Sequence, residues 1–116
     1  MRIVKIRHPP EPDSEAYLTK LVMDAAATLG WLGFHDHDSR RAEAGFPDWT
    51  LVRISRPGRP YLVFAELKGL GKRTKKERAE AQAKWLRLLD NPAAGVVARL
   101  WTLDDWDAGR IEEVLR

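Results

Sequence analysis

A continuous apolar segment constrains the fold of this chain more than any other feature. Residues 61–65 read Tyr-Leu-Val-Phe-Ala and are apolar at every position. This pattern is typical of a strand buried on both faces, so it predicts the central strand of a covered sheet. Glu66 and Lys68 follow directly. Because side chains alternate along a strand, both charged groups are expected on one face. Burying them there requires compensating charge.

Length and composition predict one compact domain spanning residues 1–116. Hydrophobic residues make up 44% of the chain, and the presence of five Trp indicates a substantial core. Charged residues make up 32%, which is enough to solvate the surface. We find neither an internal repeat nor a low-complexity linker in the sequence.

Charge and cysteine content limit the function classes. The net charge of +3 and the pI near 9.4 indicate a nucleic-acid partner only weakly, because many domains share this balance. The absence of cysteine excludes disulfides and cysteine-ligated zinc sites. No apolar run reaches membrane-spanning length, and no signal-peptide pattern opens the chain. We therefore expect a soluble intracellular protein with no membrane partner.

Periodicity and turn residues predict a mixed α/β order of elements. Asp13 or Ser14 is expected to cap the first long helix, and Gly30 to end it. Thr74 with Glu77 fits a capping box at the start of the second long helix. Strands are expected at residues 2–6, 31–37, 49–54, 61–67 and 96–101, and helices at about 14–29, 74–89, 103–107 and 110–115. This order predicts a mixed central sheet flanked by helices.

Two carboxylates stand beside the second and third of the strands that follow the first helix. Asp48 follows the turn-forming Gly45-Phe46-Pro47, and Glu66 ends the apolar run. Mg²⁺ prefers such hard oxygen ligands and keeps several waters, which leaves positions for a phosphate oxygen and an attacking water. The alternatives are that Asp48 is a turn or cap residue after Pro47 and that Glu66 forms an ion pair with Lys68 or a nearby arginine.

Gly-Phe-Pro-Asp at residues 45–48, a spacer and Glu66-Leu67-Lys68 together resemble the PD-(D/E)xK nuclease superfamily. The element order resembles its virus-type replication and repair nuclease (VRR-NUC) domain in particular. Further matches are Gly30-Trp31-Leu32, the stretch from His35 to Arg41, and the stretch from Gln82 to Leu86. The resemblance covers roughly residues 14–101. It implies a single restriction-endonuclease-like domain with an α-β-β-β-α-β core.

The resemblance also implies a metal site. Asp48, Glu66 and the backbone carbonyl of Leu67 would hold Mg²⁺ or Mn²⁺, and Glu15 on the first helix would add a carboxylate. Lys68 would orient the attacking water or offset transition-state charge, a role suited to a compact ammonium. The alternative for Glu15 is a favourable interaction with the helix dipole. The alternative for Lys68 is a solvent-exposed lysine at the strand end.

A second group of residues is expected around this site. Gln82 shares a helix face with Trp85, Leu86 and Leu89, and the resemblance implies that it supports the site or contacts the substrate backbone. It lies about one helical turn further from Thr74 than is usual in the family, so its register is open, and the alternative is an amide satisfied at a helix–sheet boundary. His35 and His37 are candidates for substrate contact, His37 more so, although a polar strand end is equally compatible. Basic residues flank the site and are candidates for binding phosphates, or else ordinary solvated charges: Arg40, Arg41, Lys72, Arg73, Lys75 and Lys76.

These features predict a Mg²⁺- or Mn²⁺-dependent deoxyribonuclease that hydrolyses phosphodiester bonds in replication, repair or recombination. Similar stand-alone domains imply branched substrates such as four-way (Holliday) junctions. Cutting two strands of a junction needs two sites, so we expect a homodimer, in the cytoplasm of a bacterial or phage-infected cell. The alternatives are a DNA-binding module that does not cut and an assembly subunit that takes its specificity from another protein.

Overall fold

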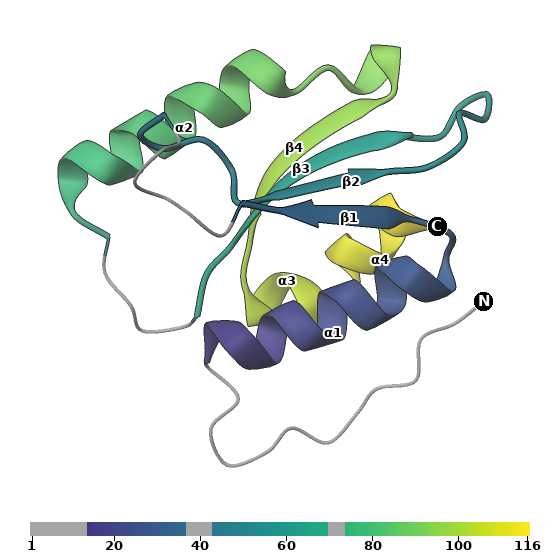
Figure 1. Ribbon diagram of the computed structural model, residues 1–116, viewed down its shortest axis with the longest axis horizontal. Helices are drawn as coiled ribbons and strands as arrows, with labels where there is room; N and C mark the ends of the chain where they lie inside the picture. Colours follow the sequence, from purple (N-terminus) through teal and green to yellow (C-terminus); the bar gives the residue numbers. More distant parts are fainter. Residues whose placement is uncertain (1–13, 37–42, 70–73) are drawn as a thin grey trace.

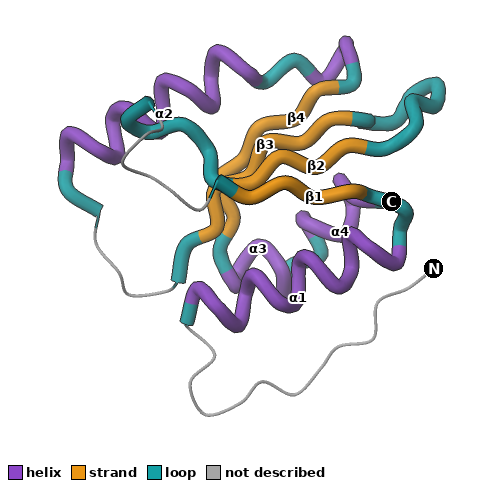
Figure 2. The backbone as a smooth tube through the Cα atoms, in the orientation of Figure 1, coloured by secondary structure: helices purple, strands orange, loops and turns teal. Residues whose placement is uncertain are grey.

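A four-stranded sheet divides the helices of this protein into two layers. The computed structural model describes residues 14–36, 43–69 and 74–116. Helix α2 covers one face of the sheet, and α1, α3 and α4 lie against the other (Figures 1 and 2). In chain order the elements are α1 (Glu15–Thr28), β1 (Leu32–His35), β2 (Trp49–Val52), β3 (Leu62–Leu67), α2 (Lys76–Leu89), the 3-10 turn η1 (Pro92–Ala94), β4 (Val96–Trp101), α3 (Leu103–Asp107) and α4 (Arg110–Leu115). The predicted mixed sheet flanked by helices is confirmed.

The sheet is mixed because of one crossover. Its strand order is β1-β2-β3-β4. The pairs β1–β2 and β2–β3 are antiparallel, whereas β3 and β4 are parallel and are connected through α2. A parallel pair needs such a crossover, because a tight turn cannot join strands that run in the same direction. As its apolar run predicts, β3 is an inner strand.

The hydrophobic core lies between the sheet and the α1, α3 and α4 layer. On β3, the alternating residues Val63, Ala65 and Leu67 are buried in it. They pack with buried side chains of the helices: Leu18, Val22 and Ala26 of α1, and Leu103, Ile111 and Leu115 of α3 and α4. In α2, by contrast, the one buried residue is Gln82. A polar side chain is therefore the most deeply buried one that α2 contributes.

The first helix and the last two helices agree with the predicted boundaries to within a residue. Ser14, one of the two predicted caps, accepts a hydrogen bond at 3.0 Å from the backbone N–H of Tyr17. Gly30 follows the helix with φ +90°, a conformation that favours glycine. Helices α3 and α4 span the predicted residues. The strand predicted at residues 2–6 lies outside the described part of the chain.

Three predicted boundaries were wrong. Lys75, not Thr74, is the N-cap of α2, and no side chain caps that helix. Lys75 has extended backbone angles, so the helix starts after it, while Thr74 lines the pocket described below. Strand β1 is shorter than residues 31–37, and β2 ends at Val52 rather than Ile54. Beyond Val52, the guanidinium of Arg53 turns to the end of α4 and donates to the carbonyl of Leu115 at 2.8 Å.

Among the described residues, no helix is both long and apolar enough to cross a bilayer.

Candidate active site

A pocket of about 490 Å³ lies where β3 ends. Four segments that are distant in the sequence meet there: the start of α1, the residue before β2, the end of β3 and the first turns of α2. Its lining comprises Glu15, Asp48, Glu66, Leu67, Lys68, Thr74, Lys75, Arg78 and Gln82. The structure thus brings together all six residues predicted to form the catalytic and metal site, together with one of the predicted basic residues, Lys75.

Strand register places the two central carboxylates opposite each other. Trp49 of β2 pairs with Ala65 of β3 in the antiparallel ladder. One step further along the same register, Asp48 faces Glu66, and their side chains point to the same side of the sheet. Asp48 is close enough to Glu66 for its charge to act directly on the Glu66 carboxyl group. Directly opposed like charges are destabilising, so this pairing needs compensation.

The pKa of Glu66 reflects its burial and the repulsion from the neighbouring carboxylate. Its side chain is only 7% exposed. Burial is the main cause that raises the pKa of Glu66 from 4.5 to about 7, and the charge of Asp48 and, less, that of Glu15 add to it. Near neutral pH the pair therefore holds a proton or requires a cation. A perturbed carboxyl in a pocket is a frequent feature of functional sites.

The loop before Asp48 is held against α2. Phe46 makes edge-to-face contacts with Phe64 of β3 and Trp85 of α2, at ring-centroid distances of 5.9 and 5.0 Å. The indole N–H of Trp85 donates to the carbonyl of Ala44 at 3.2 Å. Gly45 has φ +83°, and a Cβ atom there would lie 2.6 Å from the backbone carbon of Ala81. The Gly-Phe-Pro-Asp turn is thus fixed by a close backbone approach that places Asp48 beside Glu66.

Gly45→Ala is expected to destabilise the fold and displace Asp48. The left-handed backbone alone costs about 1–2 kcal/mol for a residue with a Cβ, and the contact with the α2 backbone adds to this. Gly58→Ala is the matched control, since Gly58 has φ +73° but nothing within 4 Å of the added atom. Chemical denaturation should show the larger loss for Gly45→Ala. Equal losses in the two variants would contradict a role for this close approach.

Glu15 lines the pocket as predicted, but it is not buried. It was expected to point inward, but its side chain is exposed, because the first turn of α1 lies at the rim of the pocket. Within the described ranges, no cluster of three or more acidic or histidine side chains is close enough to hold a metal ion. The closely spaced donors are therefore Asp48 and Glu66. Two carboxylates with open space beside them fit a hard divalent cation that keeps several waters.

Cationic groups line the same pocket as the carboxylates. Lys68 continues from β3, and its backbone N–H donates to the carbonyl of Trp101 at 3.0 Å, which fixes the chain beyond the strand. Lys75 and Arg78 come from the start of α2, whereas Lys76 is exposed and does not line the pocket. Arg78 was not among the predicted residues. Helical spacing in the sequence could have predicted it, because Lys75, Arg78 and Gln82 stand three and four residues apart and therefore share one helix face.

Gln82, whose register the sequence left open, is buried and lies within the pocket. Gln82 is 7% exposed and lines the same pocket as Asp48 and Glu66. The additional turn of α2 therefore precedes Gln82 without moving it out of the site, and this turn carries Arg78.

The predictions for the histidines and for the basic residues further from the pocket are only partly open to comparison with the structure. His35 stacks on Trp49 at a centroid distance of 4.5 Å and does not line the pocket, which favours the structural alternative. The remaining predicted residues of this group lie outside the described part of the chain: His37, Arg40, Arg41, Lys72 and Arg73.

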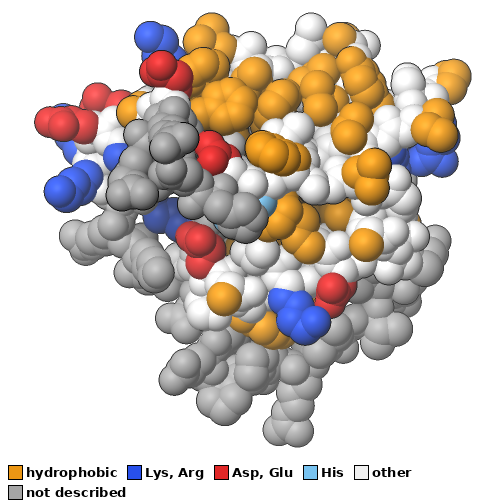
Figure 3. Space-filling view, in the orientation of Figure 1, with side chains coloured by type: hydrophobic (Ala, Val, Ile, Leu, Met, Phe, Trp, Pro, Cys, Tyr) orange, Lys and Arg blue, Asp and Glu red, His pale blue; other side chains and the backbone are white. Residues whose placement is uncertain are grey.

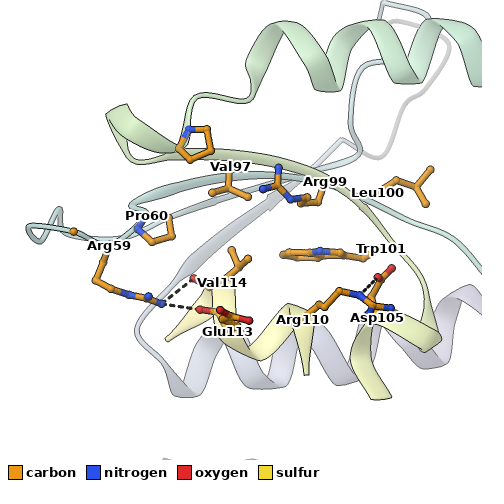
Figure 4. A pocket seen from close by; sticks show the side chains of 12 residues that line it. Arg59, Pro60, Val97, Arg99, Leu100, Trp101, Asp105, Arg110, Glu113 and Val114 are labelled. Carbon is orange, nitrogen blue, oxygen red and sulfur yellow. Dashed lines mark hydrogen bonds and ion pairs between the residues drawn. The ribbon is translucent and has the colours of Figure 1, made fainter. Parts of the chain in front are cut away.

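A second cavity of about 470 Å³ lies beside β4 and also contains arginines, but these are already engaged (Figure 4). Arg99 binds Asp90 at 2.6 Å, and Arg110 binds Asp105 at 2.7 Å. Arg59 donates to the backbone carbonyl of Glu113 at 2.8 Å. Asp90 and Asp105 neutralise Arg99 and Arg110, and the Arg59 guanidinium is held by the backbone of α4, so the cavity at the end of β3 is the better candidate site.

Comparisons of this chain with models of protein families, with curated proteins and with solved structures give no match. The functional argument therefore depends on the residues of the pocket and their geometry.

Proposed function

We propose that this protein is a Mg²⁺- or Mn²⁺-dependent deoxyribonuclease and that the pocket at the end of β3 is its active site. The observation that carries the proposal is the pairing of Asp48 and Glu66 across β2 and β3, beside Lys68 and Gln82. Two apposed carboxylates favour a cation, and neighbouring lysine and arginine side chains favour an anion. A phosphodiester bound through a divalent ion satisfies both demands.

Each residue has a distinct task in this proposal. Asp48 and Glu66 would hold the cation, with the Leu67 carbonyl as a further donor and Glu15 as an additional carboxylate at the rim of the pocket. The cation would polarise the phosphate and lower the pKa of an attacking water. Lys68 stabilises charge that develops on the phosphate oxygens during attack. Gln82 orients the water or a neighbouring phosphate oxygen by donating or accepting a hydrogen bond.

The proposal extends to branched DNA and a homodimer, because two strands of a junction require two sites. Strand β1 lies at an edge of the sheet and exposes two large apolar side chains on one face, Leu32 at 75% and Phe34 at 67%. Figure 3 shows apolar side chains gathered over this side of the molecule, with charged groups concentrated towards one end of α2. An edge strand with apolar neighbours is suited to pairing with a second copy.

Phe34→Glu is expected to convert the dimer to a monomer, because a buried charge would face the partner's apolar surface. Light scattering coupled to size exclusion measures the mass directly. Leu88→Glu is the control, since Leu88 is 70% exposed on α2 rather than on the sheet. A wild-type monomer at micromolar concentration, or a dimer that persists in Phe34→Glu, would contradict the proposed interface.

Cleavage of a substrate panel tests the activity itself. Single-stranded, duplex, flap and four-way-junction DNA are incubated with Mg²⁺, Mn²⁺ or EDTA. Metal-dependent cutting, with preference for a branched form, is the expected result. Binding without cutting on every substrate would support a DNA-binding module instead, and activity that appears only with a co-purifying protein would support the assembly-subunit alternative.

A further inference from the structure

Arg78 occupies a junction between two cavities. It lines the active-site pocket and also a neighbouring cavity of about 390 Å³ between α2 and the loop that leads to Asp48. Its side chain is exposed, and it makes no hydrogen bond or ion pair with any other residue that the structure describes. This distinguishes it from Arg99 and Arg110, whose charges are neutralised by bound carboxylates.

The charges around Arg78 define where an anion is favoured. On the active-site side, Lys68 and Lys75 line the same pocket as Arg78. On the far side, the described residues that line the neighbouring cavity include Glu43 and Glu77, and Arg78 is the one basic residue among them. Among the described residues, the cationic groups of the pocket therefore run from Lys68 through Lys75 to Arg78, and the two glutamates beyond Arg78 disfavour phosphate.

We infer that Arg78 binds the phosphate group next to the one that is cleaved and so positions the DNA strand in the pocket. This inference rests on the proposed nuclease function. The planar guanidinium can donate two parallel hydrogen bonds to one phosphate, which fixes orientation as well as position. The acidic far side of Arg78 turns the strand away from the neighbouring cavity. Arg78 thereby sets the register of the strand relative to Asp48 and Glu66.

Binding measurements with Ca²⁺ in place of Mg²⁺ test this role separately from cutting. Fluorescence anisotropy of labelled DNA is recorded between 50 and 200 mM salt for wild type, Arg78→Ala, Arg78→Lys and Arg87→Ala. Arg87→Ala is the control because Arg87 is exposed near the other end of α2 and lines none of the cavities described above. Arg78→Ala should bind about 10-fold more weakly, with the log–log salt slope smaller by about one. Arg78→Lys should keep the slope and recover only part of the affinity, because it retains charge but not the bidentate geometry.

The outcomes separate this inference from the nuclease proposal. Equal affinity and equal salt slope in Arg78→Ala and Arg87→Ala would overturn the role of Arg78, even if the wild type cuts DNA. A wild type that never cuts, with Arg78→Ala still showing the reduced slope, would overturn the nuclease proposal and leave the phosphate contact standing. A matching thermal midpoint for the four proteins shows that the differences do not come from unfolding.

Discussion

Lys68→Ala and Glu66→Ala are each expected to lower DNA cleavage at least about 100-fold, the usual effect of removing one group that stabilises a transition state. Glu66→Ala removes a ligand of the cation that activates water. Lys68→Ala leaves the cation in place but removes the charge that meets the developing negative oxygen. Single-turnover cleavage of the preferred substrate in Mg²⁺ measures both effects without interference from product release.

Two controls on α2 separate chemistry from general charge loss. Lys84→Ala and Glu80→Ala remove the same charges at exposed positions outside the pocket. These variants should cleave at the wild-type rate, and all four proteins should bind DNA measurably. If Lys68→Ala cleaved as fast as Lys84→Ala, Lys68 would have no catalytic role. The alternative, a solvent-exposed lysine at the strand end, would then be supported.

Glu66→Gln is expected to make the metal-free protein more stable at pH 8, although it removes a proposed active-site residue. In the wild type, Glu66 is buried and faces Asp48, which holds its pKa near 7. Glutamine keeps the shape and loses the charge. Since one unit of pKa shift corresponds to about 1.4 kcal/mol and solvent screens the pocket in part, we expect a gain of about 1–3 kcal/mol. Thermal unfolding in EDTA measures it as a rise of about 4–12 °C in midpoint.

The pH dependence of this gain follows from the direction of the shift. The unfolded chain releases the Glu66 proton near pH 4.5 and the folded chain near pH 7, so the folded state binds more protons in between. The wild type therefore loses stability from this group as pH rises from about 4.5 to about 7. Below that window Glu66→Gln and wild type should be equally stable, and above it their difference should be constant. A difference that does not change across this window would contradict the raised pKa.

In the presence of Mg²⁺, the wild type should become more stable than Glu66→Gln. A cation that binds only the folded state stabilises it by about 2.7 kcal/mol at one hundred times its dissociation constant. Mg²⁺ should therefore raise the unfolding midpoint of the wild type and leave that of Glu66→Gln almost unchanged. Glu80→Gln, which alters an exposed carboxylate on α2, should respond to Mg²⁺ as the wild type does.

The central strand and its charged end could be predicted from local sequence. The apolar run before Glu66 predicts that β3 is an inner strand of the sheet. Side-chain alternation predicts that Glu66 and Lys68 lie on the same face. The pairing of Asp48 with Glu66 was not available from the same pattern. This pairing depends on the register between β2 and β3. The register is determined by the turn between the strands and by the packing of Phe46, which are contacts of the folded structure.

The errors at helix starts have a common cause. Thr74 and Glu77 carry a local capping signal, yet the chain enters α2 one residue later, because Lys75 adopts an extended conformation. Glu15 shows the same limit: helical periodicity assigns it to the inward face but does not say that the first turn of α1 reaches the rim of the pocket. Arg78 was not predicted for a related reason: it stands alone beyond the basic cluster of residues 72–76, and only the helical spacing places it on one face with Lys75 and Gln82.

Calorimetric titration of Mn²⁺ into the metal-free protein tests the central claim most directly, because it asks whether Asp48 and Glu66 share a cation without depending on any DNA substrate. The wild type should bind Mn²⁺ with a measurable enthalpy, Asp48→Asn and Glu66→Gln should each lose that binding, and Glu80→Gln should retain it. Wild-type protein that binds no divalent ion, or binding that survives in both Asp48→Asn and Glu66→Gln, would contradict the account.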